Sequence, residues 1–437
     1  MSLRGPGAAE AQAQHGERLA VDGGPPVHRG PWPAWPQPTE AEEAAVLRVV
    51  RDGTWCSAAR GVRVVEAFEE AFATLHAASP AAPASPLQPE GARLGAVACS
   101  SGTAALILAL EAAGVGPGDE VIVPPYTFIA TASACLFLGA VPVFADVEPR
   151  TLCLDPEAVR RAWTPRTKAV VPVHFAGCPA DLGALSALCA ERGAALVEDA
   201  CQAPGAAWRG RPVGSWGTFG CFSFQESKNL SAGEGGAVTG SAPGIDLVWS
   251  LHNVGRQRGG AWYGHPRIGQ NARMTALQAA LLQAQLGRFE DLARRREAGA
   301  AALLEALAAV PGILPLAPPP EVTRHAWHLF AFRFDPAAFG GHSRAEFLRA
   351  LGAEGVPASA GYTLLSGNEA VQRRARANAA RGGAPEPRYE DAPLPVAAAA
   401  AQDCCWMAHP VLLAGEGEVV AAAAAMAKIQ RAWTRAG

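Results

Sequence analysis

Lysine is scarce in this chain. Only Lys168, Lys228 and Lys428 stand among its 37 basic residues, and all the others are arginines. Arginine stays protonated in proteins, whereas a lysine amine can lose its proton and attack a carbonyl carbon. We expect Lys168 at the polar edge of a strand and Lys428 solvated on a C-terminal helix. Lys228 is followed by small residues and glycines that would admit a bulky group, so it is the candidate catalytic lysine.

Other features that the sequence lacks exclude several classes of protein and partner. No run of about 18 uncharged apolar residues occurs, and residues 1–14 hold no apolar stretch of signal-peptide length. A net charge of −3 without basic runs argues against nucleic acid or an anionic membrane as partner. The ten cysteines show no CxxC pair and no zinc-like spacing, which favours free thiols in a reducing cytoplasm. His325 and His328 lack a cysteine or carboxylate to complete a metal site, so we predict none.

The length of 437 residues predicts two domains with large cores. Residues 77–94 are rich in Pro and Ala, and residues 373–395 in Arg, Ala, Gly and Pro. Neither segment shows an apolar period, so both are predicted to be surface loops that the fold does not need. The first 25 or so residues are predicted to form a mobile arm.

Between these segments, strand-like and helix-like patterns alternate. Such alternation predicts an α/β fold with a mostly parallel central sheet, helices on both faces and ligands at the carboxyl ends of the strands. The predicted strands are Glu120–Val123, Val141–Ala145, Ala169–Val173, Ala195–Glu198 and Gly220–Phe224, and the predicted helices are Thr103–Ala113, Pro125–Leu138 and Leu182–Arg192. From Asn271 a long helical run leads to a smaller α+β C-terminal domain, and its apolar part, Met274–Leu286, needs a covering surface.

Several strand ends carry polar groups. Asp199 directly follows a strand and could bind a metal, act as a base or pair with a protonated ring nitrogen. Residues 99–103 precede a helix, where hydroxyls and free N–H groups suit a phosphate, although an ordinary N-cap also explains them. Ser223 could add a phosphate contact, and Phe128 could cover a planar ring or belong to the core. Together with Lys228, this set is typical of a pyridoxal-phosphate pocket.

Four motifs carry a family resemblance. SSGTAAL (100–106), GVGPGDEVIVPPYTFIATASA (114–134), VEDACQAPGA (197–206) and FSFQESKNLSAGEGGAV (222–238) resemble the DegT/DnrJ/EryC1/StrS family of pyridoxal-phosphate-dependent sugar aminotransferases. The resemblance extends from about Leu19 to the C-terminus. It implies the type I fold of such transferases, with an arm (1–40), a large cofactor-binding domain (41–270) and a helix linker with a small domain (271–437).

The resemblance also implies roles for individual residues. Lys228 looks like the lysine that binds pyridoxal 5'-phosphate as an imine, and Asp199 like the partner of its ring nitrogen. Asn271 would reach the phosphate of the neighbouring subunit's cofactor, which implies a homodimer with a shared active site. The remaining cofactor contacts implied are Gly102, Thr103 and Ser223 at the phosphate, and Phe128 and Gln202 at the ring.

Two segments near the ends of the chain resemble one particular branch of the family. Residues 19–36 and 405–413 look like the branch that holds inosose (cyclitol) aminotransferases and 3-amino-5-hydroxybenzoate synthase. Gln202 is typical of the aminotransferases, where the synthase commonly has His. Against this, Pro204 replaces a common His, and residues 361–365 lack a second Tyr often present. His174 and His328 are plausible pocket groups, with a structural role as an equal alternative.

Three functions stay open. The first is an aminotransferase that moves an amino group from glutamine or glutamate to a keto-cyclitol or keto-sugar. In that reaction Lys228 would carry the proton between the donor carbon and the cofactor, while Asp199 keeps the ring nitrogen protonated. The second is an aromatising dehydratase on the same scaffold, and the third is a catalytically silent partner subunit. The sequence does not identify the ketone, the donor or the stereochemistry of the product.

Overall fold

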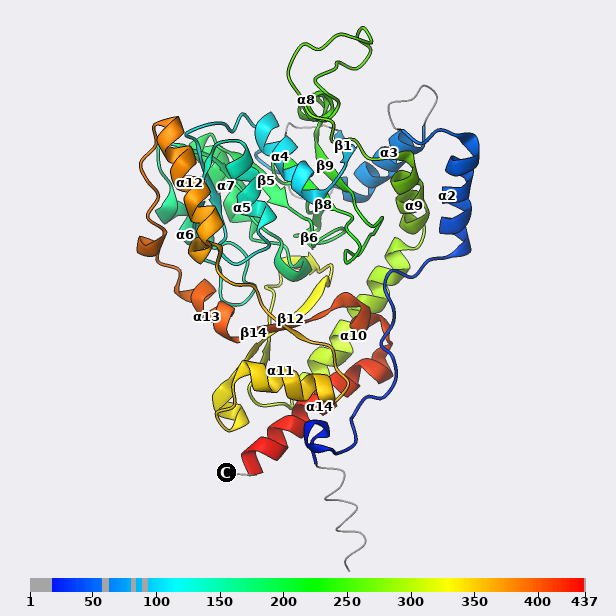
Figure 1. Ribbon diagram of the computed structural model, residues 1–437, viewed down its shortest axis with the longest axis vertical. Helices are drawn as coiled ribbons and strands as arrows, with labels where there is room; N and C mark the ends of the chain where they lie inside the picture. The colour runs from blue at the N-terminus through cyan, green and yellow to red at the C-terminus, as the bar shows by residue number, and fades with distance from the viewer. Residues whose placement is uncertain (1–17, 57–62, 80–83, 89–92, 436–437) are drawn as a thin grey trace, which may run out of the picture.

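The computed structural model describes residues 18–56, 63–79, 84–88 and 93–435. Figure 1 shows a large domain above and a small domain below, with helix α10 (Phe289–Leu307) running from one toward the other. Each domain has a hydrophobic core of its own. None of the helices in the described ranges is both long and apolar enough to cross a membrane.

A seven-stranded sheet forms the centre of the large domain. All its strands run parallel to one another except β9, which is antiparallel to both of its neighbours. Consecutive residues of β2 are buried, so both faces of the sheet are covered, and the predicted α/β architecture is confirmed. In sheet order the strands are β1 (Leu94–Cys99), β9 (Gly236–Ser241), β8 (Phe219–Ser223), β5 (Ala195–Asp199), β4 (Thr167–Val170), β2 (Glu120–Val123) and β3 (Val141–Phe144).

The helices of the large domain follow the predicted alternation, with one shift. The helix predicted to begin at Pro125 begins at Ala130, because Pro124 and Pro125 favour an extended chain there. Phe128 therefore precedes its helix instead of lying inside it. The helices are α2 (Glu40–Asp52), α3 (Val64–His76), α4 (Gly102–Ala112), α5 (Ala130–Phe137), α6 (Pro156–Ala162), α7 (Leu182–Arg192), α8 (Ala242–His252) and α9 (Ala276–Leu286).

The small domain is built on an antiparallel sheet. Its apolar core gathers phenylalanines from the central strand and from the neighbouring helices. Its strands, in sheet order, are β10 (Ile313–Pro315), β12 (Leu329–Phe334), β14 (Cys404–Ala408) and β13 (Ser359–Ala360), and its helices are α10, α11 (Arg344–Ala353) and α14 (Glu416–Arg435). A third sheet joins the domains, because β11 (Val322–Arg324) pairs with β6 (Ala207–Trp208), which pairs with β7 (Arg211–Pro212).

Residues 373–395 are not a dispensable loop, and that prediction is wrong. Helix α12 (Glu369–Gly382) occupies the first part, and α13 (Pro395–Asp403) follows. Buried Val371, Ala375 and Ala379 recur every four residues and belong to the core of the large domain. The buried amide of Asn378 donates to the carbonyl of Leu136 in the last turn of α5 and to that of Ala140 just before β3, so this helix closes one edge of the sheet. The other predicted loop, 77–94, lies partly outside the described residues.

Helix α9 does not need a second subunit to cover it. Its buried residues, among them Ala279, Ala280 and Leu282, pack within the same chain against α2 and α3. The apolar run from Met274 to Leu286 is therefore explained by intramolecular packing.

Lys428 is buried, so the expectation that it is solvated is wrong. Its ammonium group donates to the carboxylate of Glu354 at 2.9 Å and to the carbonyl of Pro25 at 2.8 Å. The same carboxylate accepts the backbone N–H groups of Ala20 and Val27. Burial of a lysine is tolerable here because its charge is paired and its protons have acceptors.

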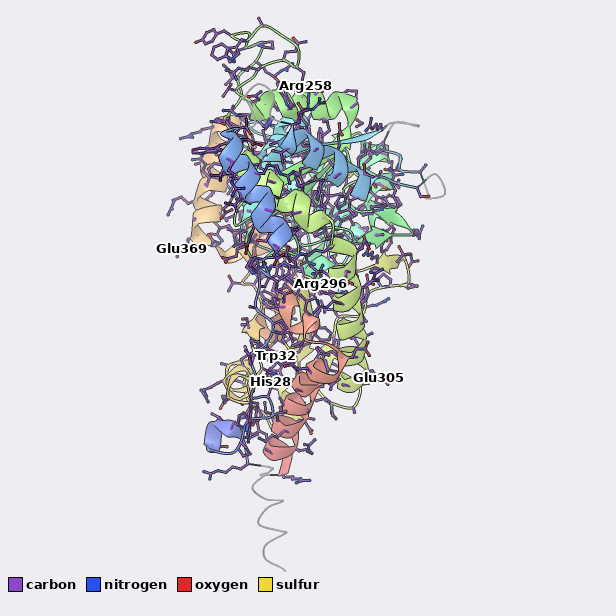
Figure 2. All side chains as sticks on the ribbon, turned by 90° about the vertical axis from the view of Figure 1, so that its right-hand side faces the viewer. His28, Trp32, Arg258, Arg296, Glu305 and Glu369 are labelled. Carbon is purple, nitrogen blue, oxygen red and sulfur yellow. The ribbon has the colours of Figure 1, made fainter. Side chains whose placement is uncertain are left out.

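The arm is thereby fastened to the small domain from residue 19 onward, whereas residues 1–17 lie outside the described ranges. The rings of His28 and Trp32 stack 4.1 Å apart beside α14 (Figure 2). His28 Nε2 lies 2.9 Å from a carboxylate oxygen of Glu418, and Trp32 Nε1 donates to the carbonyl of Gly355.

Replacing Lys428 should destabilise the small domain. Lys428→Met leaves the buried carboxylate of Glu354 without its counter-charge, and we expect the free energy of unfolding to fall by about 3 kcal/mol. Denaturant titration measures this loss, with Lys168→Met as the control because Lys168 is exposed. A second change, Glu354→Gln, should recover part of the loss. Equal stabilities of the Lys428 variant and the wild type would contradict the account.

Candidate active site

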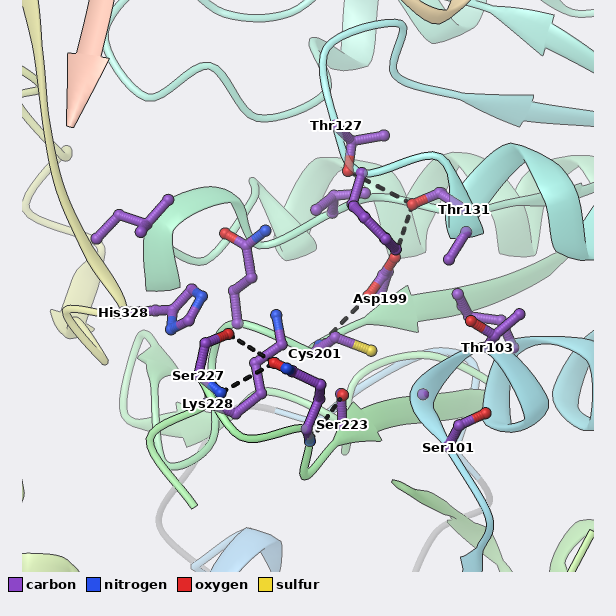
Figure 3. Close-up of a pocket in the computed structure, with 18 of the residues that line it drawn as sticks. Ser101, Thr103, Thr127, Thr131, Asp199, Cys201, Ser223, Ser227, Lys228 and His328 are labelled. Carbon is purple, nitrogen blue, oxygen red and sulfur yellow. Dashed lines mark hydrogen bonds between the residues drawn. The ribbon is translucent and has the colours of Figure 1, made fainter. Parts of the chain in front are cut away.

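A cavity of about 560 Å³ lies at the carboxyl ends of the central strands. Its walls come from the ends of β5 and β8, the start of α4, the segment before α5 and, on the other side, the small domain (Figure 3). Of the residues proposed from sequence, the cavity is lined by Gly102, Thr103, Phe128, Asp199, Gln202, Ser223 and Lys228. The sequence-based set is thus brought together with one exception, Asn271.

Lys228 stands on the loop between β8 and β9. The main chain of this residue is held at both ends, since its N–H donates to the carbonyl of Gln225 at 2.8 Å and its carbonyl accepts the indole N–H of Trp35 at 3.1 Å. Burial lowers the pKa of Lys228, against the opposing influence of Cys201 and Asp199. A lower pKa enlarges the neutral fraction of the amine at a given pH, which is the form that attacks a carbonyl carbon.

Asp199 is the last residue of β5 and is buried. One carboxylate oxygen accepts the hydroxyl of Thr131 at 2.8 Å, and the other accepts the N–H of Cys201 at 3.3 Å (Figure 3). Thr127 lies 3.4 Å from Thr131 and extends this row of hydroxyls. The carboxylate is therefore oriented from two sides while it faces the cavity.

The start of α4 forms an anion cradle. The N–H groups of Gly102 and Thr103 open the helix and have no intrahelical acceptor, so they suit a phosphate. Ser101 caps the helix by accepting the N–H of Ala104 at 3.1 Å, so the N-cap interpretation is confirmed beside the proposed phosphate site. A Cβ at Gly102 would lie 2.7 Å from Ser223 Cβ and 2.9 Å from Cys201 Sγ. Only glycine therefore permits this close approach of the start of α4 to Ser223 and Cys201.

The two candidate histidines differ. His328 lines the cavity, and its Nδ1 lies 3.2 Å from the amide oxygen of Asn229, the residue after Lys228. Burial and the nearby Lys228 hold the pKa of His328 well below its usual value, so the ring is neutral. His174 is fully buried against Glu198 at 3.2 Å and accepts the N–H of Ala180, which is a structural role.

Asn271 lies outside the cavity of its own chain. Its side chain is exposed, and its backbone bridges to Asn253. Sequence reasoning also missed some wall residues, namely Thr131, Glu234, Tyr362 and Trp406. Thr131 carries a faint signal because it follows Thr127 by four residues in the sequence, but Tyr362 and Trp406 reach the site only through docking of the small domain. No group of three His, Cys, Asp or Glu residues suited to a metal occurs within the described ranges.

Residues 37–423 match the model of the DegT/DnrJ/EryC1/StrS aminotransferase family. The chain belongs to this family. DegT/DnrJ/EryC1/StrS aminotransferases depend on pyridoxal 5'-phosphate, and the resemblance seen in the sequence motifs is confirmed.

Individual relatives agree with this assignment. The chain is 38% identical over 435 residues to L-glutamine:2-deoxy-scyllo-inosose aminotransferase of Streptomyces kanamyceticus, covering 94% of this chain and 96% of the relative. It is 36% identical over 397 residues to 3-amino-5-hydroxybenzoate synthase of Amycolatopsis mediterranei, covering 90% and 95%. The crystal structure of a 3-amino-5-hydroxybenzoic acid synthase superposes with a TM-score of 0.80 at 36% identity, covering 93% and 99%.

The residues of the cavity fit the family's cofactor. The N–H groups at the start of α4 suit a phosphate, the oriented carboxylate of Asp199 suits a protonated ring nitrogen, and Lys228 offers an amine whose pKa is lowered by burial. This DegT/DnrJ/EryC1/StrS chain is thus a pyridoxal-phosphate-dependent aminotransferase of the type I fold.

Proposed function

We propose that the protein transfers an amino group from glutamine to the ketone of a cyclic polyol, a keto-cyclitol. The observation that carries the proposal is the 38% identity over 435 residues to a glutamine:inosose aminotransferase, combined with the complete set of catalytic side chains around one cavity. Several relatives of the same description, from different actinomycete genera, match at similar identity over most of the chain.

Each residue then has a defined task. When bound, the cofactor supplies an electron-withdrawing ring and the carbonyl carbon that carries the amino group. Lys228 would hold that carbon between turnovers, and its free amine would take a proton from the substrate carbon and return one to it. Asp199, oriented by Thr131, keeps the ring nitrogen protonated. Gly102, Thr103 and Ser223 would hold the phosphate, and Phe128 would cover the ring.

Two alternatives have less support. The relationship to 3-amino-5-hydroxybenzoate synthase keeps an aromatising dehydratase as the second candidate. The amide of Gln202 beside the ring site favours transamination, because the synthase commonly has His in this motif. A silent partner subunit is the least supported, since none of the expected catalytic groups is replaced.

Product analysis tests the proposal. The purified protein is incubated with glutamine and a panel of keto-cyclitols, and the products are separated and identified by mass. We expect replacement of the keto oxygen by an amino group and formation of the oxo-acid of glutamine. An aromatic product formed with loss of water would reject the proposal in favour of the dehydratase, and absence of any product would reject both.

We further infer that the enzyme is a homodimer with shared active sites. Asn271 faces solvent, and so do three apolar residues of the loop that follows α8, Trp262, Tyr263 and Ile268. This loop projects from the body of the large domain in Figure 1. Exposed aromatic and aliphatic side chains on a projecting loop support burial against a second copy. Asn271 would then donate its amide to the phosphate in the partner's cavity.

Mixing two inactive variants tests the shared site. Asn271→Asp places a negative charge against the partner's phosphate, and Lys228→Ala removes the amine. After subunit exchange a mixed dimer has one site with both lesions and one with neither, so part of the activity should return. Mixing Lys228→Ala with Asp199→Asn is the control, because both lesions lie in the same chain's pocket and no intact site can form. If exchange occurs in the first mixture without recovery, each pocket is built from one chain.

A further inference from the structure

The amide of Gln202 lies between two groups that fix its orientation. Its Oε1 is 2.7 Å from the backbone N–H of Ala176, which can only donate. The atom facing Ala176 must therefore be the oxygen, and the NH₂ group faces the phenol oxygen of Tyr362 at 3.3 Å. The chain itself thus removes the usual ambiguity between the two ends of an amide.

This orientation of the amide determines which hydrogen bonds the hydroxyl of Tyr362 can make. Its oxygen accepts from Gln202, so its own proton cannot point to that amide. Burial and the charge of Asp199 raise the pKa of Tyr362 to about 12, so the group keeps its proton in the neutral range. Among the described residues, no side chain or carbonyl accepts this proton, and Tyr362 lines the cavity.

Contacts with two neighbouring aromatic residues fix the position of Tyr362. Its N–H donates to the hydroxyl of Tyr126 at 3.2 Å, and its ring meets that of Trp406 edge-on at 4.9 Å between centroids. A Cβ at Gly361 would come within 1.8 Å of the Tyr126 oxygen, so only glycine permits this approach. The two aromatic rings therefore form a fixed part of the cavity wall, supplied by its small-domain side.

The structure assigns to Tyr362 the role of a hydrogen-bond donor to an oxygen of the ring substrate. The phenol proton meets a hydroxyl or keto oxygen, while the faces of Tyr362 and Trp406 contact the C–H groups of the ring. A substrate without an oxygen at this place leaves a buried donor unpaired, which is costly. Tyr362 is therefore a specificity-determining residue for oxygen-rich rings, and this assignment rests on the proposed function.

Binding and half-reaction measurements test the assignment with Tyr362→Phe, which keeps the ring and removes the proton. The probe is scyllo-inositol, an unreactive cyclic polyol, titrated by calorimetry into the cofactor-loaded enzyme. We expect its Kd to rise by about tenfold. The half-reaction with glutamine alone, followed by the visible absorbance of the cofactor, should be affected clearly less than polyol binding. Tyr389→Phe is the matched control, because this buried phenol donates to the carbonyl of Pro142 away from the cavity.

A second variant tests the role of Tyr362 in a different way. Gln202→Glu places a carboxylate oxygen where the amide donor stood, so the phenol proton turns to it and polyol binding should weaken as in Tyr362→Phe. Unchanged Kd in Tyr362→Phe, no polyol binding by the wild type, or an equal loss in the glutamine half-reaction would each overturn the assignment. Failure of the wild type to aminate any keto-cyclitol would instead count against the proposed function, while the polyol titration still decides the role of Tyr362.

Discussion

Lys228→Arg is expected to abolish transamination while leaving the fold intact. A guanidinium keeps the positive charge and much of the length of the side chain, but it cannot form the imine or carry the proton. Removing a group that makes and breaks bonds lowers kcat by about 10³-fold or more. Coupled assay of oxo-acid release measures this loss, and circular dichroism checks the fold. Activity within about tenfold of wild type would refute the assignment.

Chemical labelling checks the same residue independently of activity. Borohydride reduction of the wild-type holoenzyme should fix the cofactor on the peptide that contains Lys228. Lys168 is exposed and Lys428 is ion-paired with Glu354, so neither is expected to carry the label. A label on either of these peptides would show that the imine forms elsewhere.

Asp199→Asn should retain the cofactor and lose most of the activity, by about 10²- to 10³-fold in kcat. The amide keeps the shape of the side chain and can still accept the hydroxyl of Thr131, but it no longer favours a protonated ring nitrogen. Cofactor content is measured from the absorbance of the purified variant and activity from oxo-acid release.

A matched variant distinguishes the effect of the charge of Asp199 from the effect of its orientation. Thr131→Val removes the hydroxyl that holds Asp199 but leaves the carboxylate in place. Its loss of activity should be smaller than that of Asp199→Asn. Near-normal turnover of the Asp199 variant would reject the pairing with the ring nitrogen.

Much of the site was predictable because its large-domain side obeys local rules. A carboxylate directly after a buried strand, a helix start rich in hydroxyls, and a lysine isolated among arginines are visible without coordinates. Parallel strands bring such positions to one edge, so Asp199, Ser223 and Gly102 converge whatever the loop lengths between them.

The other side of the cavity was not predictable in the same way. Tyr362 and Trp406 face it only because the small domain docks against the large one, and no local pattern encodes that docking. Helix α12 escaped notice because its arginines, and the glycines and prolines that follow it in the chain, hide a four-residue period of Val371, Ala375 and Ala379. Burial of Lys428 depends on two partners far from it in the sequence, Pro25 and Glu354, which composition cannot reveal.

That last contact has a consequence for how the protein is made. Lys428 and Pro25 are 403 positions apart, so this contact cannot form until almost the whole chain has left the ribosome. The arm leads on to Trp35, whose indole holds the carbonyl of Lys228. The large-domain sheet has all its strands much earlier in synthesis. The cavity also takes Tyr362 and Trp406 from late in the sequence, so nascent chains have no finished active site until the strands of the small domain have been made.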